Sequence, residues 1–254
     1  SLRNLITGNL QGGVWVGAAG PCALAAPWEP TGGLKGAKVL GAFAEIYNNL
    51  IGGTRGGLDT VFNAGPGIHH SNGAGCSSPE IHENIIRFNS GDGIYVASGG
   101  DMSIASNSIY SNGGAGVAVA SGDYITISSN SIHSNVGPGI DLGDDGVTAN
   151  DYVGTGPVPC STTEHDCDSG ANRLVNHPVI LSVTNSDAGT HIDYEMKGPP
   201  FAAVRVEFFS NTSMPATPSG EQYLGYEDIF LDATGYYRPT SPYLALGILR
   251  GRIS

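Results

Sequence analysis

Aliphatic and polar residues alternate in short segments over the first 143 residues, and glycine and asparagine separate the segments. This two-residue period is that of a β-strand and differs from the 3.6-residue period of a helix. The segments also recur every 23 residues. The columns that repeat at this spacing are Asn84, Asn107 and Asn130; Asn89, Asn112 and Asn135; Gly93, Gly116 and Gly139; Ile86, Ile109 and Ile132; and Ile94, Val117 and Ile140.

A repeat of this kind predicts a solenoid of stacked parallel strands. One unit cannot bury its own aliphatic face, whereas stacked units bury a continuous core, with strands about 4.8 Å apart. We expect the aliphatic columns inside and the asparagines in hydrogen-bonded ladders at the corners. The segments at 4–16 and 46–51 fit the same template with longer, glycine-rich spacers.

The columns Ile-x-x-Asn-x-Ile-x-x-Asn-x-x-x-Gly-Ile/Val-x-Val resemble the repeats of right-handed parallel β-helix proteins in the pectate-lyase-like superfamily. The resemblance covers about residues 1–143 and implies an all-β fold with right-handed coils. It leaves the activity open, because the superfamily includes polysaccharide lyases, glycoside hydrolases, epimerases, phage tail spikes and bacterial surface proteins.

The 23-residue period stops after Leu142, and residues 139–180 are similar to the exit of β-helices in secreted bacterial multi-repeat surface proteins. There a small β-sandwich follows. We therefore predict three parts: a parallel β-helix over 1–143, an acidic, disulfide-containing connecting loop over 144–176, and an Ig-like β-sandwich over 177–254. The expected sandwich strands are 179–184, 192–196, 204–209, 223–230, 236–238 and 244–253. The last begins to pair just before the chain stops, so we expect a fragment of a longer protein or a sandwich without its final strand.

The composition of the chain limits the classes of partner that we expect it to bind. The chain carries 11 Lys plus Arg against 23 Asp plus Glu, a net charge of −12, and has no basic stripe to neutralise phosphates. This charge balance argues against nucleic acid and anionic membranes as partners. The sequence contains no run of eighteen apolar residues, so we expect no membrane span. Low lysine, abundant small polar residues and four cysteines favour an extracellular or cell-surface location.

The cysteines are read as disulfides. Cys160 and Cys167 close a polar eight-residue loop, and their spacing is poor for zinc. Cys22 and Cys76 are the remaining candidate pair.

Candidate chemistry lies in outward-facing columns. If Ile86, Ile109 and Ile132 point inward, the next residue of each coil points outward, and these residues are Arg87, Tyr110 and His133. In an enzyme, Arg87 would neutralise a uronate carboxylate while His133 or Tyr110 moved a proton. The alternative is that three unrelated polar residues occupy a solvated face.

Further glycan contacts are expected at Tyr95, Asp92 and His82, close to Arg87 in the same coil. No two acids of the repeat region fall in a convincing register for glycoside hydrolysis, which requires paired carboxylates. A hydrolase is thus less favoured than a lyase.

Oxygen-rich residues follow the last coil and suggest Ca²⁺, which takes six to eight oxygen ligands. The predicted ligands are Asp141, Asp144, Asp145, Asn150 and Asp151, and Glu164, Asp166 and Asp168 either add to this site or form a second one. The alternative is an acidic, solvated loop that covers the open end of the solenoid.

The sequence leaves two main hypotheses for the function of the protein. The first is a non-catalytic extracellular module with a structural, adhesive or glycan-binding role, whose partner is a polysaccharide or a surface protein. It is favoured because the rungs carry mostly Ser and Ala, and because the chain has few lysines for a polyuronate. The second is a carbohydrate-active enzyme, either a polysaccharide lyase or a glycoside hydrolase, that works beside Arg87, Tyr110 and His133. A third possibility is a fibre component of a phage or a secretion system, which would share the solenoid and be trimeric.

Overall fold

The computed structural model describes residues 4–6, 14–17, 37–39, 45–53, 62–71, 79–151, 166, 168–246 and 252–253. The chain divides into two compact units, of which the first holds residues 1–147 with 215–219 and the second holds residues 148–214 with 220–254. The four cysteines, and with them both predicted disulfides, lie outside the described residues. Within the described part of the chain, no helix has the length and apolar character needed to cross a bilayer.

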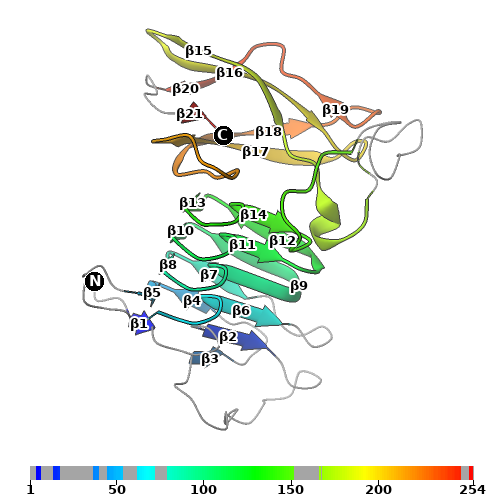
Figure 1. Ribbon diagram of the computed structural model, residues 1–254. Coiled ribbons are helices and arrows are strands. Elements are labelled where there is room, and N and C mark those ends of the chain that lie inside the picture. Colours follow the sequence, from blue (N-terminus) through cyan, green and yellow to red (C-terminus); the bar gives the residue numbers. More distant parts are fainter. Residues whose placement is uncertain are drawn as a thin grey trace. The chain divides into compact units, whose positions relative to one another are not determined.

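The first unit is a stack of coils in which every strand pairs in parallel with the equivalent strand of the next coil (Figure 1). Sheet A contains β1 (Asn4–Ile6), β5 (Asn49–Gly52), β8 (Ile85–Arg87), β10 (Ser108–Tyr110) and β13 (Ser131–His133). Sheet B contains β3 (Ala37–Val39), β2 (Val14–Gly17), β6 (Ile68–Ser71), the first part of β9 (Ile94–Ala105), β11 (Val117–Val119) and β14 (Ile140–Leu142). Sheet C contains β4 (Glu45–Tyr47), β7 (Glu80–His82), the second part of β9, and β12 (Gly122–Ser128).

The strand register follows the 23-residue period of the sequence. Ile109 is the partner of Ile86 on one side and of Ile132 on the other, and all three side chains are buried. The second aliphatic column pairs Val117 with Ile94 and Ile140. Ile140 was expected inside with the rest of its column, but it is 44% exposed. It belongs to the last coil, where no further repeat stacks on it.

Two asparagine ladders hold the corners of the coils. In the first ladder, Asn84 Nδ2 donates to Asn107 Oδ1 at 3.0 Å, and Asn107 Nδ2 donates to Asn130 Oδ1 at 3.0 Å. In the second, Asn89 and Asn112 are joined in the same way at 2.8 Å. The ladder amides also donate to backbone carbonyls, as Asn107 Nδ2 does to those of Ile81 at 2.8 Å and Ala105 at 3.0 Å, and so pair groups that the corner would otherwise leave without a partner. The residue before each of these asparagines has a positive φ, so the chain turns sharply there.

The second unit contains two small antiparallel sheets. The first sheet comprises β15 (Val179–Ser186), β16 (Gly189–Lys197), β19 (Tyr236–Tyr237) and β20 (Tyr243–Leu246). The second sheet comprises β17 (Ala203–Asn211), β18 (Gln222–Phe230) and β21 (Arg252–Ile253). A 3₁₀ turn, η1 (Ala171–Leu174), precedes them.

The core of the second unit alternates along these strands, as a half-buried strand requires. Its buried members are Ile192, Tyr194, Met196, Val206, Phe208, Ile229 and Leu231. Strands were predicted at five of the observed positions with boundary shifts of a few residues. The single strand expected over 244–253 was wrong, because β20 pairs with β16 whereas β21 pairs with β17.

Candidate functional site

The structure brings Arg87, Tyr110 and His133 together on the outward face of sheet A. Strand pairing places Tyr110 opposite Arg87 on one side and opposite His133 on the other. The isoleucine before each of them points into the core, so the two-residue period of the strand turns these three side chains outward. The predicted column therefore exists as a continuous ladder.

The ladder residues touch one another. Nη1 of Arg87 donates a hydrogen bond of 2.9 Å to the hydroxyl oxygen of Tyr110. The rings of Tyr110 and His133 stack in parallel, with centroids 5.2 Å apart and an angle of 3° between the planes. The guanidinium carbon of Arg87 lies 5.3 Å from the Phe88 ring and 5.7 Å from the Tyr110 ring. Aromatic faces attract a cation at this distance, so both rings help to fix the guanidinium.

Arg87 carries a charge without a counter-ion among the described residues. It forms no ion pair there, and its Nε atom is buried with no hydrogen-bond partner. The described strands of sheet A also contain no Asp or Glu. By contrast, the ammonium or guanidinium groups of Lys197, Arg205 and Arg238 each lie within 3.2 Å of a carboxylate oxygen.

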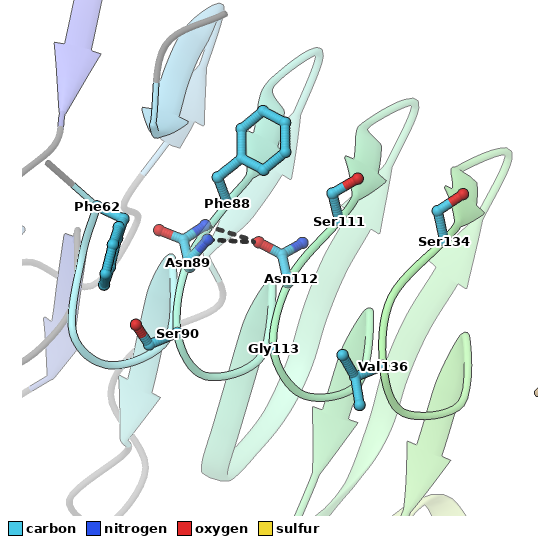
Figure 2. A pocket seen from close by; sticks show the side chains of 9 residues that line it. All are labelled: Phe62, Phe88, Asn89, Ser90, Ser111, Asn112, Gly113, Ser134 and Val136. Atoms are coloured by element: carbon cyan, nitrogen blue, oxygen red, sulfur yellow. Dashed lines mark hydrogen bonds between the residues drawn. The ribbon is translucent and has the colours of Figure 1, made fainter. Parts of the chain in front are cut away.

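A shallow groove of about 360 Å³ runs across the turns that follow sheet A (Figure 2). It crosses successive coils, so its long direction follows the stack. Its lining consists of Phe62, Phe88, Asn89, Ser90, Ser111, Asn112, Gly113, Ser134 and Val136. Three of these side chains are apolar and at least 40% exposed, namely Phe62, Phe88 and Val136.

Sequence reasoning missed the apolar residues of this groove. The signal for Phe88 is its column, in which the equivalent residues of the next two coils are Ser111 and Ser134. All three have φ between 54° and 56°, a conformation that is uncommon for any residue other than glycine and that costs most for a bulky one. A phenylalanine that is exposed at such a position contributes little to the core.

The other predicted glycan contacts do not form one group. Tyr95 lies on sheet B beside His69, with ring centroids 5.2 Å apart. Asp92 lies near Tyr95, and its Oδ1 accepts the Ala115 N–H at 2.7 Å. Burial raises the pKa of Asp92, although that hydrogen bond opposes the shift. His82 lies on sheet C instead, stacked on Tyr47 at 5.4 Å.

His82 belongs to a second small cluster that the sequence did not reveal. Its Nε2 lies 2.9 Å from Oε1 of Glu45, and Glu80 completes the group. Glu45 and Glu80 are paired across β4 and β7, although 35 residues separate them in sequence. All three are exposed or half-exposed, and Glu45 already partners the imidazole of His82.

Comparison with known families accounts for the coils. Residues 34–168, more than half of the chain, match the family model described as a right-handed β-helix region. The chain belongs to the right-handed β-helix family. The predicted all-β fold with a right-handed parallel β-helix is thereby confirmed, and small antiparallel sheets lie in the part of the chain where a sandwich was predicted. No curated protein matches the sequence.

The predicted Ca²⁺ ligands at the end of the β-helix have other partners. The carboxylate of Asp141 accepts hydrogen bonds from the backbone N–H groups of Asp145 and Gly146 at 3.1–3.3 Å, which closes a turn. Burial raises the pKa of Asp141, with further contributions from Asp144 and Asp145. In the second unit, Asn150 exchanges hydrogen bonds of 2.8 Å with the backbone of His177.

Asp151, the last predicted ligand, joins a different group. Its carboxylate lies with those of Asp166 and Asp168, and one oxygen of each is within 4.8 Å of the others. All three belong to the unit that follows the β-helix. The sequence had placed Asp166 and Asp168 either with Asp141 or in a separate site, and the structure groups them with Asp151.

Proposed function

We propose that the protein is an extracellular or cell-surface module whose β-helix binds a glycan chain along sheet A and the adjoining groove. The observation that carries this proposal is Arg87, a half-buried guanidinium without a described counter-ion, which the rings of Phe88 and Tyr110 and the hydroxyl group of Tyr110 hold in place. A buried charge is costly unless a partner compensates it. A carboxylate of a bound sugar supplies that compensation.

The surroundings of Arg87 suit a sugar chain. Phe88 offers an exposed apolar ring, and the serines of the neighbouring coils offer hydroxyl groups. The groove crosses several coils, so an extended polymer along it meets one set of side chains per coil, about every 4.8 Å. Sites of this type combine apolar contact area with a few placed polar groups.

The charge of the protein limits which glycan can bind. The protein has a net charge of −12 and one cation in the described part of the ladder. It therefore repels a polysaccharide that carries a negative charge on every sugar. The site therefore favours a glycan in which neutral sugars separate the acidic ones. Hyaluronan has that pattern, polygalacturonate has a carboxylate on every ring, and dextran has none.

Isothermal titration calorimetry with these three polysaccharides tests the proposal. We expect hyaluronan to bind best and Arg87→Ala to weaken its binding by about tenfold or more, because a charge-assisted hydrogen bond contributes about 1.5–3 kcal/mol. Arg205→Ala is the matched control, since that arginine is exposed and paired with Asp228. Equal binding by wild type and Arg87→Ala would overturn the proposal.

The same experiment separates binding from catalysis. A polysaccharide lyase, in which Tyr110 or His133 moves the proton, would release unsaturated uronate that absorbs in the ultraviolet. A glycoside hydrolase would release reducing ends without that absorbance. We expect neither product, because the described strands of sheet A offer no pair of carboxylates for hydrolysis, and Arg87 is their one guanidinium for neutralising a uronate carboxylate.

A further inference from the structure

His133 ends the outward ladder of sheet A, one rung beyond Tyr110. β13 is the last strand in the order of sheet A, so β10 with Tyr110 is the strand beside it. The two rings lie parallel, with centroids 5.2 Å apart and 3° between the planes. Nδ1 of His133 lies 3.0 Å from Oγ of Ser134. The stack and the hydroxyl group fix the imidazole, and Nε2 is the nitrogen left for a ligand.

The imidazole lies beside the proposed path of the glycan. Ser134, the next residue in the chain, lines the groove, as does Phe88, the residue that follows Arg87 (Figure 2). Arg87 and His133 therefore stand at equivalent places along the groove, two coils apart. Strands of neighbouring coils are about 4.8 Å apart, so two coils correspond to about 9.6 Å.

Few charged or titratable groups face His133. Tyr110 lies against it, and Arg87 lies on the other side of Tyr110, where its Nη1 donates to the phenol oxygen at 2.9 Å. The described strands of sheet A contain no Asp or Glu. A proton on His133 would thus add a second cation to the ladder, with an aromatic face to support it and no carboxylate of these strands to neutralise it.

We infer that His133 is a second binding group for the acidic sugars of the glycan, and that it acts in its protonated form. The inference rests on the glycan-binding function proposed above. Histidine is the side chain whose charge ordinarily changes between pH 5 and pH 8. In the imidazolium form both nitrogens donate, so Nδ1 donates to Ser134 while Nε2 donates to a sugar carboxylate. The ladder then binds its glycan more tightly in acid than at pH 8.

The spacing of the two cations also selects among acidic glycans. One uncharged rung, that of Tyr110, separates Arg87 from His133. A polysaccharide whose acidic sugars alternate with neutral ones presents its carboxylates with the same interruption, and hyaluronan is of this kind. A uronate on every ring would place one more carboxylate against the phenol, where no cation meets it. Protonation of His133 should therefore increase the preference for hyaluronan over polygalacturonate.

Isothermal titration calorimetry with hyaluronan at pH 8 and pH 5 tests the inference, at a temperature at which circular dichroism shows the chain folded at both. We expect wild type to bind about three- to fivefold more tightly at pH 5, the effect of one exposed ion pair. His133→Gln should lose this gain. His133→Arg, charged at both pH values, should bind at pH 8 as tightly as wild type does at pH 5. The control is His177→Gln, at an exposed histidine of the second unit, which should behave as wild type.

The protons taken up on binding distinguish a ligand role of His133 from a structural one. Calorimetry in buffers of different ionisation enthalpy counts them, and we expect uptake by wild type but not by His133→Gln or His133→Arg. The inference alone is overturned if hyaluronan binds through Arg87 at pH 8 but no more tightly at pH 5, or if His133→Gln keeps the gain. If hyaluronan binds at neither pH, the glycan proposal fails and this inference fails with it.

Discussion

The two units of this protein bury their cores in different ways. In the β-helix, Ile86, Ile109 and Ile132 repeat one contact from coil to coil, and the asparagine ladders repeat another. In the second unit, each core position occurs once, as with Tyr194 against Phe208 at 5.3 Å. A repeated contact links each rung to the rungs on both sides, so a single substitution affects three coils. A unique contact affects only its own surroundings.

The units also differ in the polar groups that they bury. The β-helix unit buries neutral amides in its ladders, the carboxylate of Asp141, and the imidazole of His70, whose two nitrogens have no hydrogen-bond partner. The second unit buries the carboxylates of Asp151 and Asp166. Neutral ladder groups satisfy one another, whereas clustered carboxylates require a proton or a cation. We therefore expect the contributions of His70 and Asp166 to the stability of their units to respond in opposite directions to acid.

The largest effect should come from breaking a ladder. Asn107→Ala removes hydrogen bonds to the carbonyls of Ile81 and Ala105 and to both neighbouring amides, and leaves buried groups unpaired. We expect a loss of about 3–5 kcal/mol in the free energy of unfolding of the β-helix, measured by urea denaturation. Asn211→Ala, a buried asparagine outside the repeats, is the control and should cost less than half as much. Equal losses would remove the distinction between repeated and unique cores.

The second-largest effect should be a different dependence of stability on pH in the two units. Burial and the charge of His69 lower the pKa of His70 to about 4, so the unfolded chain binds the proton more tightly. The contribution of His70 to the stability of the β-helix therefore falls by about 2 kcal/mol between pH 8 and pH 5. His70→Leu should remove this pH dependence, which denaturation of wild type and variant at the two pH values would measure.

The second unit should respond with the opposite sign. The folded pKa of Asp166, about 6, lies above that of the unfolded chain, so the folded state binds the proton more tightly. We expect a gain of about 1 kcal/mol between pH 8 and pH 5, which Asp166→Asn should abolish. A second unit that loses stability through Asp166 on acidification would contradict this reasoning.

A smaller effect on stability is expected when the hydroxyl group of a tyrosine is removed, and it should differ between Tyr194 in the core and Tyr110 on the surface. The hydroxyl of Tyr194 donates to Oε2 of Glu227 at 2.7 Å, so Tyr194→Phe should cost about 1 kcal/mol of stability. Tyr110→Phe should leave stability within about 0.5 kcal/mol, because its hydroxyl lies on the surface ladder. It should instead weaken glycan binding severalfold, since Arg87 loses its support. Thermal denaturation and calorimetry give the two readouts.

The smallest effect concerns strain at the groove. Asparagine tolerates a positive φ better than phenylalanine, so Phe88→Asn should raise the stability of the β-helix by about 0.5 kcal/mol. The same variant should bind glycan less tightly, because the exposed ring is lost. A variant that is more stable and binds equally well would show that Phe88 has no part in the site.

Much of the first unit was predictable, because the repeat is written directly in the chain. A spacing of 23 residues places Arg87, Tyr110 and His133 in one column without any knowledge of the fold. The same logic failed at Ile140, where the stack ends. Phe62 and Val136 escaped notice because they lie in turns, whose side chains follow the local path of the backbone and no simple period.

Contacts between residues that lie outside the 23-residue repeat could not be predicted from the sequence. The sequence could not separate Asp151 from Asp141, ten residues away, because both lie in one acidic, glycine-rich stretch. Their hydrogen bonds distinguish the two residues. The carboxylate of Asp141 accepts a bond from the backbone of its own turn, whereas that of Asp151 accepts one from the side chain of Asn176. The pairing of Glu45 with His82 likewise depends on which strands become neighbours.

The amino-acid sequence alone thus determined the parallel coils, their register and the residues of the outward ladder, because stacked repeats turn spacing along the chain directly into spacing in space. The tertiary structure alone decided that Arg87 has no counter-ion among the described residues, that the groove has apolar walls, and that three aspartates converge. These features arise from burial and from contacts between distant segments. Such contacts depend on how the completed fold distributes its charges, and a local pattern does not encode them.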